Sequence, residues 1–399
     1  MQMLSCTLGA LALVALAAAQ SGQTPLSLET SQLETHVPGL NLDLDELRLV
    51  QFSLDSEPEW ITEREKLQAK IMGRDCMDIT DTPLLGTISE KPHFSYPPPN
   101  STVVAGVLSH LSKNEAKANL EHFSSYHTRW CYTETGRASS EWLFSKILAY
   151  TAELASDEQR QLISVESVKH SWKQNSIIIS ISPPHALRSA PITVLGAHID
   201  SVNRKDPLGG RAPGADDDGS GTVTILEAYR ALLVAGYIPT SPLEFHFYAG
   251  EEAGLLGSQA IVSRYETAGK VIRGMIQIDT VLFHKAGTRE EIGVISNENQ
   301  VDATLTKFLT QVIDRYLDIP WAKTIYPSGP TGPNPSSDHA SWTKAKYQAC
   351  QVLEGQFNNS NPHLHGPDDR IDTSPENSFD HLLQFAKLAV GFAIEMSSY

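Results

Sequence analysis

Residues 191–200, PITVLGAHID, predict a buried β-strand that stops abruptly at polar side chains. Residues 192–197 are mostly apolar, and His198 and Asp200 follow within three positions. A short apolar run bounded by a proline is typical of a strand that helices cover on both faces. The side chains that follow it are therefore expected at the rim of a sheet.

The same kind of segment recurs along the 399-residue chain. Further strand candidates are SIIISIS, LEFHFYAGEE, GMIQIDTV, IGVIS and YQACQVLE. Segments with helical periodicity alternate with them, at residues 138–155, 222–236, 257–267, 300–317 and 376–396. This alternation predicts a single α/β domain whose mixed, mostly parallel central sheet is flanked by helices on both faces.

Polar side chains follow three of these strands, namely His198, Asp200, Glu251, Glu252 and Asp279. The triplet Asp216–Asp217–Asp218 precedes the helix candidate at 222. Because the carboxyl ends of parallel strands share one edge, these groups are expected to converge where α/β proteins bind ligands. Each aspartate alone is more typical of a helix cap. Together, the acidic groups would repel one another unless a divalent cation neutralised them.

The type of ligand indicates which metal would bind at this edge. Histidine and carboxylate ligands without thiolate favour Zn²⁺, with Mn²⁺ or Co²⁺ as alternatives, over the all-oxygen sites of Ca²⁺ and Mg²⁺. A carboxylate can bridge two such ions, and paired ions assist hydrolysis. A glutamate that is not needed as a ligand can then accept the proton of the attacking water.

Six motifs occur in order along the chain: GAHIDS, PGADDDGSG, YAGEEAGLLGS, QID, SSDHASW and NPHLHGPDD. In these motifs and their spacing, residues 94–399 resemble the secreted leucine aminopeptidases of fungi and bacteria, co-catalytic two-zinc exopeptidases without a protease-associated insert. The resemblance implies a single zinc-exopeptidase domain that acts as a monomer. It would hydrolyse N-terminal, large apolar (leucine-like) residues from peptides with a free N-terminus.

The resemblance also implies how the site residues divide their roles around two Zn²⁺ ions. Asp217 would bridge the metals. One ion would add His198 and Asp279, and the other would add Glu252 and His365.

Glu251 would be the general base for the zinc-activated water. Asp200 would accept a hydrogen bond from the free ring nitrogen of His198, and Asp218 would follow a cis peptide bond. Asp216 receives no role and is expected to be solvated. Asp338 and His339 of SSDHASW are expected to be scaffold.

One stretch departs from the family. Many members carry a Cys-x-x-x-Cys pair with a tyrosine inside it before SDHAS, whereas this chain reads YPSGPTGPNPSSDHASW. The preference for leucine is therefore left open. Two alternatives to the aminopeptidase remain, a single-zinc glutaminyl cyclase-like enzyme and an inactive binding module of the same fold.

The N-terminal part of the chain predicts export and processing. Residues 1–19 form an apolar run ending in AAA, typical of a secretory signal peptide, with a membrane anchor as the alternative. Residues 20–90 hold 14 Asp or Glu against 5 Lys or Arg. They predict an acidic propeptide ending between 85 and 98, or otherwise an N-terminal subdomain, before a catalytic domain at 91–399. A helix is expected in residues 57–72, with Trp60, Ile61, Leu67 and Ile71 on one face.

Charge, cysteines and sequons complete the expectations. A formal charge of −16 disfavours nucleic acid and anionic membranes as partners. If Cys76 leaves with the propeptide, Cys131 and Cys350 are candidates for a disulfide. Asn100 and Asn358 begin acceptor sequons for N-glycosylation, consistent with a secreted, extracellular protein.

Overall fold

The computed structural model describes residues 40, 42–88, 90–184, 186–187, 189–329, 332–333 and 335–398. The predicted signal peptide at 1–19 and residues 20–39, 41 and 89 of the predicted propeptide lie outside these residues. Within the described part, no helix is long and apolar enough to cross a membrane.

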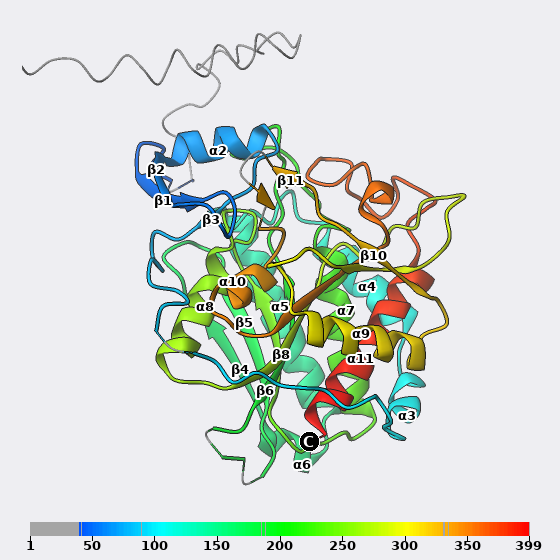
Figure 1. Cartoon of the computed structure of the whole chain (residues 1–399). Helices are drawn as coiled ribbons and strands as arrows, with labels where there is room; N and C mark the ends of the chain where they lie inside the picture. Colours follow the sequence, from blue (N-terminus) through cyan, green and yellow to red (C-terminus); the bar gives the residue numbers. More distant parts are fainter. Residues whose placement is uncertain are drawn as a thin grey trace, which may run out of the picture. The chain divides into compact units, whose positions relative to one another are not determined.

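A mixed eight-stranded sheet forms the centre of the catalytic part (Figure 1). Its strands are β4 Ile163–Val168, β5 Ser176–Ile181, β6 Ile192–His198, β7 Leu243–Tyr248, β8 Ile272–Ile278, β9 Ile292–Ile295, β10 Trp321–Thr324 and β13 Ala349–Leu353. They are arranged in the order β10-β9-β13-β8-β6-β7-β5-β4. The small pair β11 Ser328–Gly329 and β12 Gly332–Pro333 forms a separate hairpin.

The four central strands are parallel to one another. β6 pairs in parallel with both β7 and β8, and β8 pairs in parallel with β13. β9 and β10 are also parallel, whereas β4, β5 and the β9–β13 pair are antiparallel. The prediction of a mixed, mostly parallel sheet is confirmed, and the carboxyl ends of its central strands meet at one edge.

Helices cover both faces of this sheet, as predicted (Figure 1). α5 Glu134–Leu154, α7 Gly219–Val234, α9 Ala303–Tyr316 and α11 Phe379–Ser397 pack on one face, and α8 Leu256–Thr267 and α10 His339–Lys344 on the other. Side chains of each strand alternate between the two layers: Leu195 and Ala197 belong to the first core, and Val194 to the second. Burial on both faces explains why these strands are nearly continuous apolar runs.

Every helix and strand proposed for the catalytic part is present, with ends displaced by a few residues. The sequence pattern did not predict β4, β10 or the shorter helices α3 Val104–Leu108, α4 Lys113–Phe123, α6 Asp157–Leu162, α10 and η1 Phe357–Asn359. β4 alternates between exposed and half-buried residues at the edge of the sheet, so its apolar signal is weak. Short and partly exposed elements leave little periodicity in the sequence.

Residues 42–86 form a small module of their own, called here the N-terminal module. Its three-stranded sheet has the order β2-β1-β3, with β1 Leu47–Gln51, β2 Glu59–Thr62 and β3 Met77–Asp78, and α2 Glu63–Ile71 lies beside it. The expected helix face is wrong for Trp60 and Ile61, which belong to β2. The reason is a capping box in which Thr62 and Glu65 bond to each other's backbone N–H, so that the helix starts only at residue 63.

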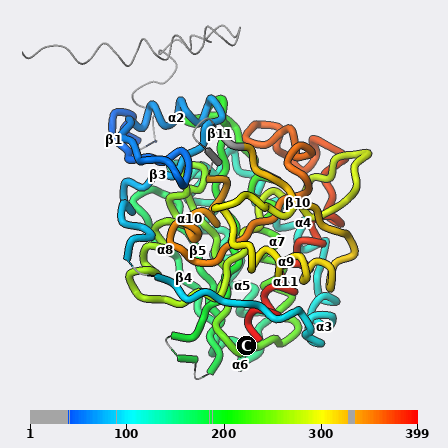
Figure 2. The backbone as a smooth tube through the Cα atoms, viewed as in Figure 1, coloured from blue at the N-terminus to red at the C-terminus, as the bar shows by residue number. Residues whose placement is uncertain are grey.

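Residues 90–102 contain no helix or strand and lie along the catalytic part (Figure 2). The backbone N–H of Phe94 donates to Gln348 Oε1 at 2.5 Å, and the Tyr96 hydroxyl donates to the carbonyl of Arg273 at 2.7 Å. The backbone N–H of Ser101 donates to Glu395 Oε1 at 2.8 Å. This segment is therefore held against the catalytic part at several points.

The disulfide proposed between Cys131 and Cys350 is not formed. Both thiols are free and buried, as is that of Cys76. Cys350 lies on β13 and its thiol points at the carbonyl of Met275 on the neighbouring strand, at 3.6 Å. Cys131 lies before α5, with its sulfur 3.5 Å from the position that a Cβ on Gly250 would take. Sequence could not show that Cys350 lies on a central strand while Cys131 lies in the turn before α5, beside Gly250.

Gly221 in the first turn of α7 is predicted to be essential for packing this helix onto the sheet. A Cβ there would lie 2.1 Å from the carbonyl oxygen of Ile278 on β8. Gly221→Ala should lower the free energy of unfolding by about 1–3 kcal/mol or more, because the backbone must move. Gly106→Ala on α3 is the matched control, since nothing lies within 4 Å of its added methyl group. Urea unfolding curves of the two variants measure this loss of stability. Equal unfolding midpoints for Gly221→Ala and Gly106→Ala would contradict the packing argument.

Candidate metal centre

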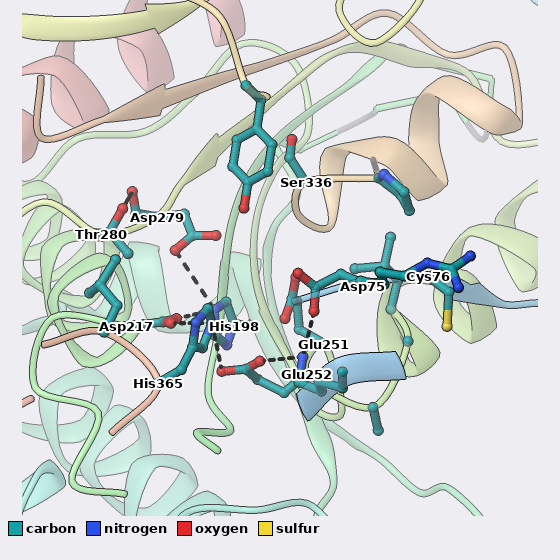
Figure 3. Close-up of a pocket in the computed structure, with 18 of the residues that line it drawn as sticks. Asp75, Cys76, His198, Asp217, Glu251, Glu252, Asp279, Thr280, Ser336 and His365 are labelled. Atoms are coloured by element: carbon teal, nitrogen blue, oxygen red, sulfur yellow. Dashed lines mark hydrogen bonds and ion pairs between the residues drawn. The ribbon is translucent and has the colours of Figure 1, made fainter. Parts of the chain in front are cut away.

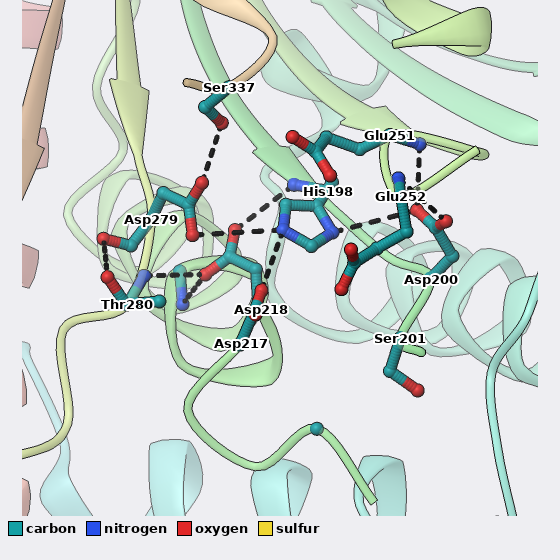
Figure 4. A network of polar contacts seen from close by, with 12 residues as sticks. His198, Asp200, Ser201, Asp217, Asp218, Glu251, Glu252, Asp279, Thr280 and Ser337 are labelled. Carbon is teal, nitrogen blue, oxygen red and sulfur yellow. Dashed lines mark hydrogen bonds and ion pairs between the residues drawn. The ribbon is translucent and has the colours of Figure 1, made fainter. Parts of the chain in front are cut away.

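His198 is the last residue of β6, and its imidazole is buried at the carboxyl edge of the sheet. Its Nε2 lies 3.1 Å from Asp217 Oδ1 and 3.7 Å from Asp279 Oδ1. Asp279 follows the last residue of β8, the strand beside β6, and its other oxygen accepts from the Ser337 hydroxyl at 2.6 Å. Two adjacent strand ends thus present an imidazole and a carboxylate to the same point, and the segment before α7 adds the carboxylate of Asp217, as Figure 4 shows.

Asp217 lies between two histidines. Its Oδ1 faces His198, and its Oδ2 lies 2.8 Å from His365 Nε2. The peptide bond between Asp217 and Asp218 is cis, as the family resemblance implied. The carboxylate is therefore directed with one oxygen toward each imidazole, which is the arrangement required of a bridging ligand.

Glu252 and His365 complete a second group around Asp217. Glu252 Oε1 lies 3.5 Å from His365 Nε2. Glu252 is carried by the turn after β7, and His365 by a loop in which it adopts a left-handed φ of 55°. The backbone N–H of Arg204 donates to the His365 carbonyl at 3.0 Å and thereby fixes the loop.

The chemistry of these donors fits zinc. The ligand atoms of His198, Asp217 and Asp279 lie within 4.8 Å of one another, and so do those of Asp217, Glu252 and His365. Both groups combine imidazole nitrogen with carboxylate oxygen and are largely buried, the environment in which zinc is bound. The structure brings all five ligands proposed from the sequence into these two groups.

The excess of negative charge in the two groups would also favour binding of a cation. Burial alone would lower the pKa of His198, but the surrounding carboxylates, Glu251 and Asp279 first among them, raise it well above its ordinary value. Burial likewise opposes the charge of His365, and Glu252 and Asp217 raise its pKa. Carboxylates that draw protons onto buried imidazoles would be neutralised more fully by metal ions.

Glu251 stands apart from the ligands. It belongs to neither of the two metal-binding groups found in the described part of the chain, although it lines the same pocket. Burial raises the pKa of Glu251 well above its ordinary value, and the nearby carboxylates of Glu252 and Asp338 act in the same direction. A carboxylate with a raised pKa is a stronger proton acceptor, which suits the role of general base.

The carboxylates of Asp218 and Asp200 accept hydrogen bonds from backbone N–H groups and belong to neither metal-binding group of the described residues (Figure 4). Asp218 Oδ1 accepts from the N–H groups of Gly221 at 2.8 Å and Thr280 at 3.2 Å, and Oδ2 accepts from that of His198 at 3.1 Å. One carboxylate thus caps α7 and joins it to β6 and β8.

The predicted role of Asp200 needs correction. Asp200 Oδ1 lies 3.6 Å from His198 Nδ1, which is too long for a hydrogen bond. Its two oxygens instead accept from the backbone N–H groups of Glu251 at 3.0 Å and Glu252 at 3.2 Å. Asp200 therefore orients the turn that carries the base and a ligand.

Asp216 is not solvated, contrary to expectation, because its side chain is fully buried. Oδ1 accepts from the backbone N–H of Leu282 at 2.9 Å, and Oδ2 from the amide of Asn361 at 2.9 Å. These bonds tie the start of α7 to the segment after β8 and to the loop before His365.

Sequence reasoning missed Asp369 and Arg129. Asp369 accepts from the backbone N–H groups of Asp216 at 2.9 Å and Asp217 at 3.0 Å. Arg129 is fully buried and donates to the carbonyls of Ile199 and Gly214, both at 2.9 Å. Burial lowers the pKa of Arg129 to about 10, while the surrounding aspartates counteract the shift, so the guanidinium stays charged at neutral pH.

Different signals mark these two missed residues. Asp369 lies in the NPHLHGPDD motif beside a predicted ligand, and its motif is a signal that could have been followed. No pattern marks Arg129, which precedes a helix far from the other motifs in sequence.

The pocket around the metal-binding groups combines charged and apolar walls (Figure 3). Tyr326, Leu353, Phe357 and Leu364 line one part of it. The other wall comes from the N-terminal module, whose contributing residues are Lys66, Leu67, Lys70, Arg74, Asp75 and Cys76. The module therefore contributes directly to the wall of the pocket.

The remaining motif histidines behave as expected. His339 of SSDHASW is buried and belongs to neither metal-binding group, and neither of its ring nitrogens has a hydrogen-bond partner among the described residues. Burial lowers the pKa of His339 to about 3, so it is neutral. His363 is likewise outside both groups in the described part of the chain.

Comparison with known proteins identifies relatives over nearly the whole chain. The sequence model of peptidase family M28 matches residues 177–390. Leucine aminopeptidase 1 of Fusarium vanettenii is 38% identical over 384 residues, which cover 93% of this chain and 92% of the relative. Leucine aminopeptidase 1 of Grosmannia clavigera is 41% identical over 365 residues, covering 87% and 85%.

A solved structure is similar as well. The LapA aminopeptidase of Legionella pneumophila superposes with a TM-score of 0.74 at 26% identity, covering 89% of this chain and 94% of that protein.

Asp369→Ala is predicted to weaken the site through the backbone. It would leave the N–H groups of Asp216 and Asp217 without their acceptor, and each buried unpaired N–H costs about 1–3 kcal/mol. We expect a lower free energy of unfolding together with weaker zinc binding, measured by urea unfolding and by competition with a chromophoric chelator.

Asp368→Ala is the matched control, because the neighbouring side chain is 61% exposed and pairs only loosely with Arg370 at 3.7 Å. It should change neither quantity. Unaltered zinc affinity in Asp369→Ala would show that Asp369 does not position the bridging carboxylate.

Proposed function

The chain belongs to peptidase family M28 and is a zinc-dependent aminopeptidase, and from this premise we propose that it releases large apolar residues from the N-termini of peptides with two zinc ions. The observation that carries the proposal is the sharing of Asp217 between two groups of ligands. Asp217 would bridge the ions, with His198 and Asp279 on one side and Glu252 and His365 on the other.

When bound, zinc at these positions supplies Lewis-acid polarisation of the scissile carbonyl and lowers the pKa of the attacking water. The protein's own contribution is to hold the ligands and exclude solvent. His198, Asp217, Glu252 and Asp279 are each less than a tenth exposed, so electrostatic interactions among them are little screened.

Glu251 moves the proton in this mechanism. Its backbone N–H is held by Asp200 at 3.0 Å, which fixes the turn and leaves the carboxylate directed into the pocket. One carboxylate oxygen accepts the proton of the attacking water and then returns it to the nitrogen of the departing peptide.

Apolar side chains around the metal-binding groups support a preference for large apolar residues. Leu353, Phe357 and Leu364 come from β13 and the loops that follow it, close to His365. Tyr326 stacks edge-on against Phe357 with ring centroids 4.8 Å apart, and its backbone is held on both sides by the Asn297 amide. Burial of a leucine-sized side chain against this wall would favour binding.

Glu251→Gln tests the base. The amide keeps the shape but cannot accept a proton, so hydrolysis of leucine p-nitroanilide should fall by about 10²–10⁴-fold. The zinc content, measured by atomic emission, should stay at two per chain.

Glu153→Gln, at an exposed position on α5, is the matched control and should retain full activity. Near-normal turnover in Glu251→Gln would remove Glu251 from its role. One zinc per chain at saturation would instead favour a single-metal, glutaminyl cyclase-like site.

We further propose that the enzyme is a secreted monomer made as a precursor, with a signal peptide at 1–19 and a propeptide ending near residue 90. Asn100 and Asn358 are both exposed, as glycosylation requires. Residues from Phe94 onward are bonded to the catalytic part, whereas residues 42–86 form a separate small sheet and helix, which supports a boundary between them.

The N-terminal module is proposed to inhibit the uncleaved enzyme. α2 supplies Lys66, Leu67 and Lys70 to the wall of the pocket, and the segment after it supplies Asp75. The module is fixed in place by bonds such as that from the Asp78 N–H to the Gly254 carbonyl at 3.0 Å. A peptide substrate would need the space that these side chains occupy.

Limited proteolysis of the full chain tests this inhibition. A cut between residues 86 and 93, followed by release of the module, should raise hydrolysis of leucine p-nitroanilide by at least about tenfold, because an occluding segment competes with substrate. Mass spectrometry would locate the cut. Equal activity before and after release would refute the inhibitory role, and the same treatment of Glu251→Gln controls for activity of the added protease.

A further inference from the structure

A lysine of the N-terminal module is in contact with one of the two metal-binding groups. Lys70 on α2 places its Nζ 2.7 Å from Glu252 Oε2, and only 12% of the Lys70 side chain is exposed. A cation supplied by the chain thus already balances a proposed zinc ligand.

The contact is specific to one group. Glu252 directs Oε1 toward His365 and Oε2 toward Lys70. In the part of the chain that the structure describes, no lysine or arginine forms an ion pair with His198, Asp217 or Asp279. The group of His198, Asp217 and Asp279 is therefore free to bind a metal ion while the module is in place, whereas the Glu252 group is not.

Asp75 holds Lys70 in position. Lys70 Nζ lies 3.1 Å from Asp75 Oδ1, and Asp75 in turn pairs with Arg204 Nη2 at 2.9 and 3.0 Å. The backbone N–H of the same Arg204 donates to the carbonyl of His365, the other ligand in this group. The ammonium is thereby linked to both ends of the group, through Glu252 directly and through Arg204 to His365.

Two cations cannot share these oxygens without cost. Zinc binds carboxylate oxygen at about 2.0–2.2 Å, so an ion on Glu252 would lie close to the Lys70 ammonium in a buried site where repulsion is weakly screened. Removing the ammonium without a metal would leave the charge of Glu252, beside Asp217, opposed by the more distant His365 imidazole at 3.5 Å. Lysine and metal are alternative solutions to the same charge imbalance.

We propose that Lys70 substitutes for the metal ion at the site of Asp217, Glu252 and His365, so that the full chain binds one zinc tightly and the second weakly until the N-terminal module moves away. This inference rests on the proposed two-zinc function. Release of the module then completes the metal centre as well as opening the pocket. Binding is coupled in both directions, so zinc at the second site must also weaken the hold of the module.

The test compares zinc and Co²⁺ titrations of the uncleaved full chain, wild type against Lys70→Met. The methionine keeps a long side chain and removes the charge. In the wild type we expect one tight site and a second at least about tenfold weaker, and in Lys70→Met the second dissociation constant should fall by at least about tenfold. Lys113→Met, which breaks an exposed pair with Asp380, is the control and should match the wild type. Equal second-site affinity in wild type and Lys70→Met would overturn the inference.

A second measurement needs no variant and so remains valid if Lys70→Met does not fold. Adding zinc to the wild-type chain at concentrations that fill the second site should accelerate cleavage of residues 42–90 by trypsin. A cleavage rate that does not change with zinc would overturn the inference. A single bound ion in every protein at saturating zinc would instead overturn the two-zinc function on which it rests.

Discussion

The accumulation of carboxylates at one edge of the sheet is the constraint on which the rest of the molecule depends. Asp200, Asp217, Asp218, Glu252 and Asp279 are all buried there. Without compensation they would repel one another and resist burial. The fold supplies compensation of three kinds: backbone N–H groups, the buried guanidinium of Arg129, and positions for external cations. The parallel order of the central strands is what forces all of these groups together.

The carboxylates share one chemistry but serve different purposes, depending on what lies within reach of each oxygen. Asp218 and Asp369 accept only from N–H groups, and they hold the cis turn and the start of α7. Asp217 directs its two oxygens at two imidazoles. A cluster that looks uniform in sequence is thus divided into ligand, base and scaffold by the backbone around it.

The sequence predicted the sheet and its flanking helices because these features have strong local signals, whereas the five proposed ligands were assigned from the family resemblance. Buried strands are apolar runs, and the polar residue that ends each run is visible at once. Arg129 has no such signal, because its role comes from contacts with residues about 70 to 85 positions away. The unpaired Cys131 and Cys350 are a second example, since tertiary packing puts one in the turn before α5 and the other on β13. Lys70 also looked like an ordinary helix lysine, and only tertiary packing places it on Glu252.

The hydrogen bonds that fix residues 94–101 would limit how far the enzyme can digest its own N-terminus. If the chain is cleaved near residue 90, as proposed above, the enzyme acquires a new N-terminus, which is the kind of group that an aminopeptidase digests. Only a few residues beyond that end, Phe94, Tyr96 and Ser101 are bonded to Gln348, Arg273 and Glu395. A chain held along its backbone cannot extend into the pocket of a neighbouring copy. Self-trimming would therefore end within a few residues, and the mature enzyme would keep a defined start.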